Sequence, residues 1–171
     1  MELSVIYDIS PYDWRAVGAS LFCGSVVGLE RQLRGKPVGI RTASLIVLGT
    51  YLFLATAFEL QGQVIDPSRV VGQVITGVGF LGAGVMLGRD GVVVGVTSAA
   101  TIWVLAAIGV AISVDSLEAA MKLSILVVCI LYGLDVMEGR FKVLGRGVHA
   151  SVRSRFPLSR TKGEDTDKFA H

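Results

Sequence analysis

Long apolar runs alternate with short polar segments along this chain. The run from Arg69 to Gly88 is the clearest, since the 19 residues that follow Arg69 carry no charge. At ~1.5 Å rise per residue, a helix of that length crosses the ~30 Å hydrocarbon core of a bilayer. The pattern therefore predicts a transmembrane helix at residues 69–88.

Four other runs support the same interpretation. They cover residues 16–29, 42–60, about 94–114 and 119–137. The first has 14 residues and reaches a spanning length only if Trp14 and Arg15 extend to the interface, so an interfacial or re-entrant segment is its alternative. The predicted fold class is all-α: a polytopic membrane protein with about five transmembrane helices.

The polar segments predict the domain organisation and the orientation. Residues 1–15 form a short extracytoplasmic lead, residues 16–137 the transmembrane domain, and residues 138–171 a basic cytoplasmic tail that we expect to be largely disordered. If the helices alternate in direction, 13 of the 16 Lys and Arg residues fall on one side of the membrane. The positive-inside rule then places the N-terminus outside and the C-terminus in the cytoplasm.

Composition agrees with a membrane protein and narrows the chemistry. Hydrophobic residues make up 52% of the chain, charged residues 18%, and the mean hydropathy is +0.64. Cys23 and Cys129 lie inside apolar runs, where we expect two buried thiols rather than a disulfide. His149 and His171 have no neighbouring ligand residues. We expect no catalytic residues, no cofactor, no metal site and no nucleic-acid partner.

The glycines of the 69–88 run allow two interpretations. Gly77, Gly79 and Gly82 spell GxGxxG, but no strand pattern precedes them and no acidic residue lies about 20 positions further on, which argues against a dinucleotide site. Small residues instead let helices approach closely in lipid. We expect this helix to be the packing centre, with helix-packing positions at Gly24, Gly28, Gly77, Gly79, Gly82, Gly84 and Gly88.

The glycine pairs also suggest assembly with further copies of the chain. Gly24 with Gly28, and Gly84 with Gly88, would each place two small residues one turn apart on a helix face. A homo-oligomer that uses these two faces is the hypothesis.

The loop at residues 30–42 is basic and rich in turn residues. Its simplest role is topology together with contact to anionic lipid headgroups. The sharper hypothesis is a docking or anion site formed by Glu30, Arg31, Lys36 and Arg41, with Asp135 beneath it.

Polar groups also fall within or beside the third and fourth spans. Arg69, Gln73, Thr97 and Thr101 are candidates because such groups at membrane depth indicate function or pairing. Hydrogen bonding between Gln73 and Thr97 is favoured over solute binding. Trp103 lies close to mid-depth, so we expect it to be buried in the bundle with its indole N–H bonded.

Three separated segments resemble the membrane domain of the MgtC/SapB family. They are GLERQLRGKPVGIRTASLIVLG, RVVGQVITGVGFLGAGVML and VGVTSAATIWVLAAIGVAIS, within about residues 16–137. The family's ER and RT positions fall on Glu30, Arg31, Arg41 and Thr42, and its loop lysine on Lys36. The family's RxxxQ segment falls on Arg69 and Gln73, and its GxGFLGAG segment falls on residues 77–84. The polar position that follows the family's short turn is Thr97, and the family's tryptophan is Trp103.

The resemblance implies a multi-pass protein of the bacterial inner membrane. It implies a link to survival at low magnesium and, in some members, to virulence inside host cells. The family picture is regulatory, through contacts with other membrane proteins that include the proton-translocating ATP synthase. Many members continue into a cytoplasmic ACT-like domain, and the 34 residues after position 137 are too few and too polar for one.

Two other function classes are compatible with the sequence. A small carrier or channel for Mg²⁺ or another cation would use Gln73, Thr97 and Thr101, although no carboxylate lies at mid-membrane to compensate the charge. A scaffold that only anchors the basic tail at the membrane is the third.

Overall fold

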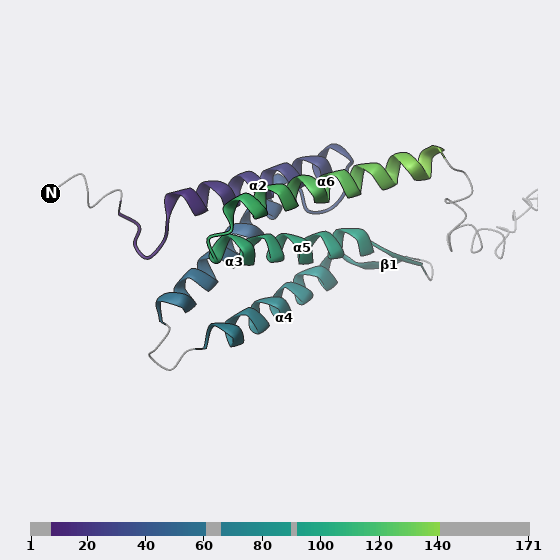
Figure 1. Ribbon diagram of the computed structural model, residues 1–171. Coiled ribbons are helices and arrows are strands. Elements are labelled where there is room, and N and C mark those ends of the chain that lie inside the picture. The colour runs from purple at the N-terminus through teal and green to yellow at the C-terminus, as the bar shows by residue number, and fades with distance from the viewer. Residues whose placement is uncertain (1–7, 61–65, 90–91, 141–171) are drawn as a thin grey trace, which may run out of the picture. The chain divides into compact units, whose positions relative to one another are not determined.

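The computed structural model describes residues 8–60, 66–89 and 92–140, with 87–89, 92, 134–135 and 138–140 described as backbone only. The helices are α2 (Trp14–Leu33), α3 (Ile40–Glu59), α4 (Pro67–Val85), α5 (Val96–Ser113) and α6 (Leu117–Arg140), and two short strands are β1 (Leu87–Arg89) and β2 (Val92–Val94). The all-helical prediction is confirmed for this part of the chain (Figure 1). Three of the helices, α3, α4 and α5, are long and apolar enough to cross a membrane.

Local sequence signals explain where the helices begin and end. The side chain of Asp13 accepts a hydrogen bond from the Arg15 N–H at 2.8 Å and caps α2. Asp66 caps α4 in the same way through Ser68, and Pro67 takes the first helical position, where its missing N–H costs nothing. After α2, Gly35 adopts a left-handed φ of 62°, which ends the helix.

Close backbone approach joins α3 to both α2 and α5. A Cβ added at Gly24 would lie 2.4 Å from the Ser44 Cα, and one at Gly28 would lie 2.6 Å from the Ile40 Cα. At the other interface, a Cβ on Gly109 of α5 would lie 2.6 Å from the Thr50 Cβ. These glycines allow three helices to pack at distances that any larger residue would prevent.

Helices α3 and α5, and not α4, form the packing centre of the chain, so that prediction is wrong for a single chain. Helix α5 packs on α2, α3 and α4, and 44% of its apolar stretch is buried. In α4 only 11% of the apolar stretch is buried, and the buried residues are Val78 and Gly82. The physical reason is that α4 approaches its neighbours along one narrow stripe.

The predicted helix at 69–88 ends earlier than expected. A two-stranded antiparallel hairpin follows α4, with Leu87 opposite Val94 and Arg89 opposite Val92. The run of valines in β2 favours the extended backbone. Gly88 therefore lies in β1 and cannot form a helical pair with Gly84, which corrects that part of the packing prediction.

A glycine fixes the joint where the hairpin meets α5. Gly95 has a φ of 92°, and an ideal Cβ there would lie 2.3 Å from the Val85 carbonyl oxygen. Only glycine suits this position, and α5 packs beside α4.

Helix α6 packs beside α2 within the compact unit that extends to Leu134. Ser124 is fully buried and donates to the Met121 carbonyl oxygen within its own helix at 2.8 Å, and the Arg34 guanidinium of the α2 C-cap lies 5.0 Å from the Tyr132 ring centroid of α6. Helix α6 runs parallel to α2 (Figure 1). Cys23 is buried as expected, whereas Cys129 is exposed because it lies on the outer face of α6.

Candidate functional site

Two charged side chains are buried where α2 ends. Glu30 is 8% exposed and Arg31 is 3% exposed, although the sequence pattern assigned both to a solvated loop. They are buried because α2 continues through residue 33, which places its last turn against the start of α5. Buried charges require compensation by opposite charge or hydrogen bonds.

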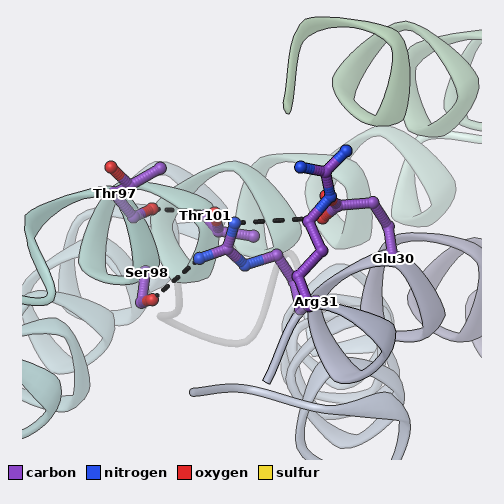
Figure 2. A network of polar contacts seen from close by, with 6 residues as sticks. Glu30, Arg31, Thr97, Ser98 and Thr101 are labelled. Atoms are coloured by element: carbon purple, nitrogen blue, oxygen red, sulfur yellow. Dashed lines mark hydrogen bonds and ion pairs between the residues drawn. The ribbon is translucent and has the colours of Figure 1, made fainter. Parts of the chain in front are cut away.

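Arg31 joins α2 to α5. Its Nη2 donates to the Oγ of Ser98 at 3.0 Å, and its Nη1 lies 3.8 Å from the Glu30 Oε2 (Figure 2). Ser98 is itself 2% exposed and belongs to the first turn of α5. The guanidinium thus fixes the beginning of α5 against the end of α2.

Glu30 is neutralised by charge more than by hydrogen bonding. The Arg34 Nε forms an ion pair with the Glu30 Oε1 at 2.6 Å. Within the described residues neither carboxylate oxygen accepts a hydrogen bond, and the Arg31 Nε also donates none. Two arginines around one carboxylate leave this buried cluster with a net positive charge.

Ser98 is the buried partner of Arg31 that sequence reasoning did not select. It begins the buried face of α5 that continues through Thr101, Ile102 and Leu105 at helical spacing. Thr101 is 3% exposed and donates to the Thr97 carbonyl oxygen at 2.8 Å, so its hydroxyl is satisfied within its own helix (Figure 2). The one available signal was the helical period that groups Ser98 with this apolar face.

The remaining members of the predicted loop site lie on the surface. The side chains of Lys36, Arg41 and Thr42 are exposed, whereas Glu30 and Arg31 are buried. The structure therefore divides the predicted cluster into a buried pair and an exposed basic segment. The Asp135 side chain lies outside the described residues.

The loop between α2 and α3 contains a strained position. Val38 has a φ of 70°, a left-handed conformation that a β-branched residue rarely adopts, and its side chain is 7% exposed. Such strain persists only where the surrounding structure enforces it. This loop therefore holds a defined shape between the buried pair and Arg41.

A cavity of about 580 Å³ lies between α3 and α4. Most of the side chains that line it are apolar, and Gln73 supplies the one amide. Its lining consists of Thr42, Leu45, Ile46, Gly49, Thr50 and Phe53 of α3, and Val70, Gln73, Val74, Gly77, Val78 and Leu81 of α4. Arg69 immediately precedes this lining and is exposed.

Gln73 and Thr97 do not form the predicted pair. Gln73 lies twelve residues before the end of α4, or ~18 Å along the helix axis, while Thr97 lies in the first turn of α5 beside that end. The distance along α4 therefore separates the two side chains.

Trp103 also departs from its prediction. It is 55% exposed and not buried in the bundle. The buried face of α5 passes through Leu105, Ala106 and Gly109, which directs Trp103 outward.

The glycines of α4 differ in what surrounds them. Gly82 contacts Ala99 of α5, with 3.6 Å from an ideal Cβ to the Ala99 Cβ. Cβ atoms added at Gly77, Gly79 and Gly84 would meet no described atom within 4 Å. Gly24 and Gly28 are already covered by α3, so they are not available as the surface for a second copy.

No group of three or more His, Cys, Asp and Glu side chains comes together among the described residues. The chemistry that the described side chains support is a buried ionic contact and an apolar cavity.

Comparison with known proteins identifies the family. The model of the MgtC family matches residues 17–140. YhiD of Escherichia coli K12, provisionally named a magnesium transporter, is 43% identical over 145 residues, covering 81% of this chain and 66% of that protein. Protein MgtC of Salmonella paratyphi A is 33% identical over 150 residues, covering 87% of this chain and 63% of its own length.

The chain thus spans about two thirds of the length of these curated relatives. No solved structure matches it. The family model covers α2 to α6, and it includes the buried pair, the hairpin and the α3/α4 cavity. The chain belongs to the MgtC family.

Proposed function

We propose that this protein is a membrane regulator without enzymatic activity, and that it acts by helix contact with another membrane protein. The observation that carries the proposal is the exposure of α4, of which only Val78 and Gly82 are buried. A helix that is apolar, long enough to cross a membrane and yet barely packed in its own chain has a surface for a transmembrane helix of a partner.

The contact surface is the face of α4 that carries Gly72, Thr76, Gly79 and Ala83, here called the outer α4 face. All four residues are exposed, and a Cβ at Gly72 or Gly79 would meet no described atom within 4 Å. They recur at helical spacing, so a second helix can approach the backbone closely along them. A second copy of the chain could also bind at this surface, whereas Gly24 and Gly28 are covered by α3 and cannot form a homo-oligomer interface.

The membrane topology is part of the proposal. Helix α2 has 20 residues, enough at ~1.5 Å each to cross the ~30 Å hydrocarbon core, and its charged end is buried against α5. Five spans with the N-terminus outside and the C-terminus in the cytoplasm place the 30–42 loop on the cytoplasmic side. The expected location is the bacterial inner membrane.

The biological setting follows from family membership. We propose a role in adaptation to magnesium limitation and in virulence or stress, with the ATP synthase as a candidate partner. The name of the Escherichia coli relative supports the connection to magnesium.

The test combines crosslinking with growth. A photocrosslinking residue at Thr76 should capture a membrane protein in cells starved of magnesium, whereas the same probe at Leu126, an exposed position of α6, should not. Gly79→Leu should abolish the Thr76 crosslink and impair growth at low magnesium without lowering the amount of protein, because the site has space for the side chain. Normal growth and an unchanged crosslink in Gly79→Leu would contradict the proposal.

The second candidate function is cation transport, which the name of the Escherichia coli relative favours. The α3/α4 cavity argues against Mg²⁺ because its lining contains no carboxylate. Mg²⁺ uptake into proteoliposomes above that of empty vesicles, and lost in Gln73→Ala, would support transport in place of regulation.

A further inference from the structure

We propose that the α3/α4 cavity holds one acyl chain of an anionic phospholipid, whose headgroup phosphate binds at Arg41. This inference is independent of the outer α4 face, because the residues that line the cavity lie on another side of the helix. It assigns a lipid, rather than a partner helix or an ion, to this site.

The position of the cavity along the helices fits one leaflet. The start of α3 and the end of α4 lie at the same end of the bundle (Figure 1). On α3 the lining residues lie between ~3 Å (Thr42) and ~20 Å (Phe53) from that end, measured along the helix axis. On α4 they lie between ~6 Å (Leu81) and ~22 Å (Val70) from the same end. An acyl chain reaches about 15 Å, half of the hydrocarbon core, so it would lie against the Leu81 and Gly77 part.

Charge at the mouth of the cavity selects an anionic headgroup. Arg41 is exposed and precedes Thr42, the lining residue nearest the start of α3. The nearest acids in the sequence are Glu30 and Glu59, of which Glu30 is buried between two arginines and Glu59 lies at the far end of α3. Of the acids near Arg41 in the sequence, neither is free to compete for a phosphate there.

The size of the cavity excludes a helix as its occupant. A helix segment ~17 Å long and ~10 Å in diameter occupies roughly 1,300 Å³, more than twice the 580 Å³ available. Volumes of ~300–1,000 Å³ with mostly apolar walls are typical of sites for small molecules and single chains. A free anion would leave the apolar walls without a partner.

Two glycines allow the cavity to be filled without disturbing the fold. Gly77 and Gly49 both line it, and a Cβ at either would meet no described atom within 4 Å. A leucine at either position therefore enters the space that the acyl chain would occupy. Gly79 has the same free space and does not line the cavity, which makes Gly79→Leu the matched control.

The test is native mass spectrometry of the full chain in detergent. The probes are phosphatidylglycerol, phosphatidylethanolamine with the same acyl chains, and glycerophosphoglycerol, which is the headgroup alone. We expect tight binding of phosphatidylglycerol only, an affinity about tenfold lower in Gly77→Leu and Gly49→Leu, and no change in Gly79→Leu. Arg41→Gln should lower the affinity about fivefold and remove the preference over phosphatidylethanolamine.

Several results would overturn the inference. Equal binding of the two lipids by the wild type would remove the headgroup site, and equal binding of the headgroup alone would remove the acyl-chain site. The lipid would lie elsewhere if both Gly77→Leu and Gly49→Leu still bound phosphatidylglycerol and each variant were monodisperse on gel filtration. Because Gly79→Leu tests the partner contact and Gly77→Leu the lipid, the two proposals fail separately.

Discussion

Helices α4 and α5 are neighbours of similar length and apolar character, and the structure uses them in opposite ways. Helix α5 buries Ser98, Thr101 and an apolar stripe from Ile102 to Ile112 among three other helices. Helix α4 buries two residues, and Phe80 on its surface is 82% exposed.

The difference shows what a membrane protein can do with glycine. Gly109 of α5 and Gly79 of α4 both lie inside apolar helices, yet only the first is in contact with another helix of its own chain. In lipid, moving an apolar surface out of the surrounding hydrocarbon releases little free energy, so α4 can remain exposed to lipid without a strong tendency to aggregate. The contacts that hold the bundle are therefore local, and they should be vulnerable to single substitutions.

The largest effect is expected at the buried arginine that attaches α5 to α2. Arg31→Met removes the contact with Ser98 and one of the two arginines near Glu30, and should destabilise the fold by about 3 kcal/mol or more. Thermal unfolding followed by gel filtration in detergent measures the loss. The double variant Glu30→Gln/Arg31→Met should recover part of it, and an unchanged melting temperature in Arg31→Met would contradict the role of the contact.

The next effect separates the two glycines. Gly109→Ala places a methyl group 2.6 Å from the Thr50 Cβ and should cost up to about 3 kcal/mol. Gly79→Ala, with free space around it, should stabilise α4 by about 0.5–1 kcal/mol because alanine favours the helix. The same melting experiment should give shifts of opposite sign, and shifts of equal sign would invalidate the distinction between the helices.

Ser98→Ala should have a smaller effect than loss of the arginine. The substitution removes the hydrogen bond between Ser98 and the Arg31 guanidinium, but Arg31 keeps its ion contact with Glu30. The free energy of unfolding should fall by about 2 kcal/mol. In a double-mutant cycle with Arg31→Met the two losses should not add. Additive losses would mean that Ser98 stabilises α5 through another contact.

The smallest effect concerns the start of α4. Hydrogen bonds from the side chain and backbone of Ser68 lower the pKa of the Asp66 carboxyl below its usual 3.8. The Asp66 carboxyl has a lower pKa in the folded protein than in the unfolded chain. Its stabilisation of the folded state is therefore complete above the unfolded pKa and is lost as the pH falls through the folded pKa. Hydrogen exchange of the first amides of α4 should quicken on acidification below about pH 4, with those of α5 unaffected. Asp66→Asn keeps a capping side chain and should remove this dependence on pH.

The sequence predicted the helices well because each is an apolar run bounded by turn residues. It ended the first one at Leu29 because Glu30 and Arg31 are charged, and charge normally marks a solvated segment. Their burial depends on Ser98, which lies 67 residues away from Arg31 in the sequence. A contact of that kind leaves no periodic signal in the residues around either partner.

The site predictions were limited by the same absence of tertiary information. Glycine spacing identified α4 as a helix with small faces, but whether a neighbour covers a face depends on how the helices pack. The exposure of Trp103 likewise follows from which side of α5 meets α3. The acyl-chain cavity needs two helices at a set distance, so no single segment of the sequence predicts it.

The joint at Gly95 gives α4 a mechanical property. The close contacts of α4 gather near its end, where Gly95 meets the Val85 carbonyl and Gly82 meets Ala99. Val70 lies ~22 Å from this end along the axis, while Leu81 lies ~6 Å from it. A rotation of α4 about this end would therefore displace Val70 almost four times as far as Leu81, so a small change at the hairpin would have its largest effect at the other end of the helix.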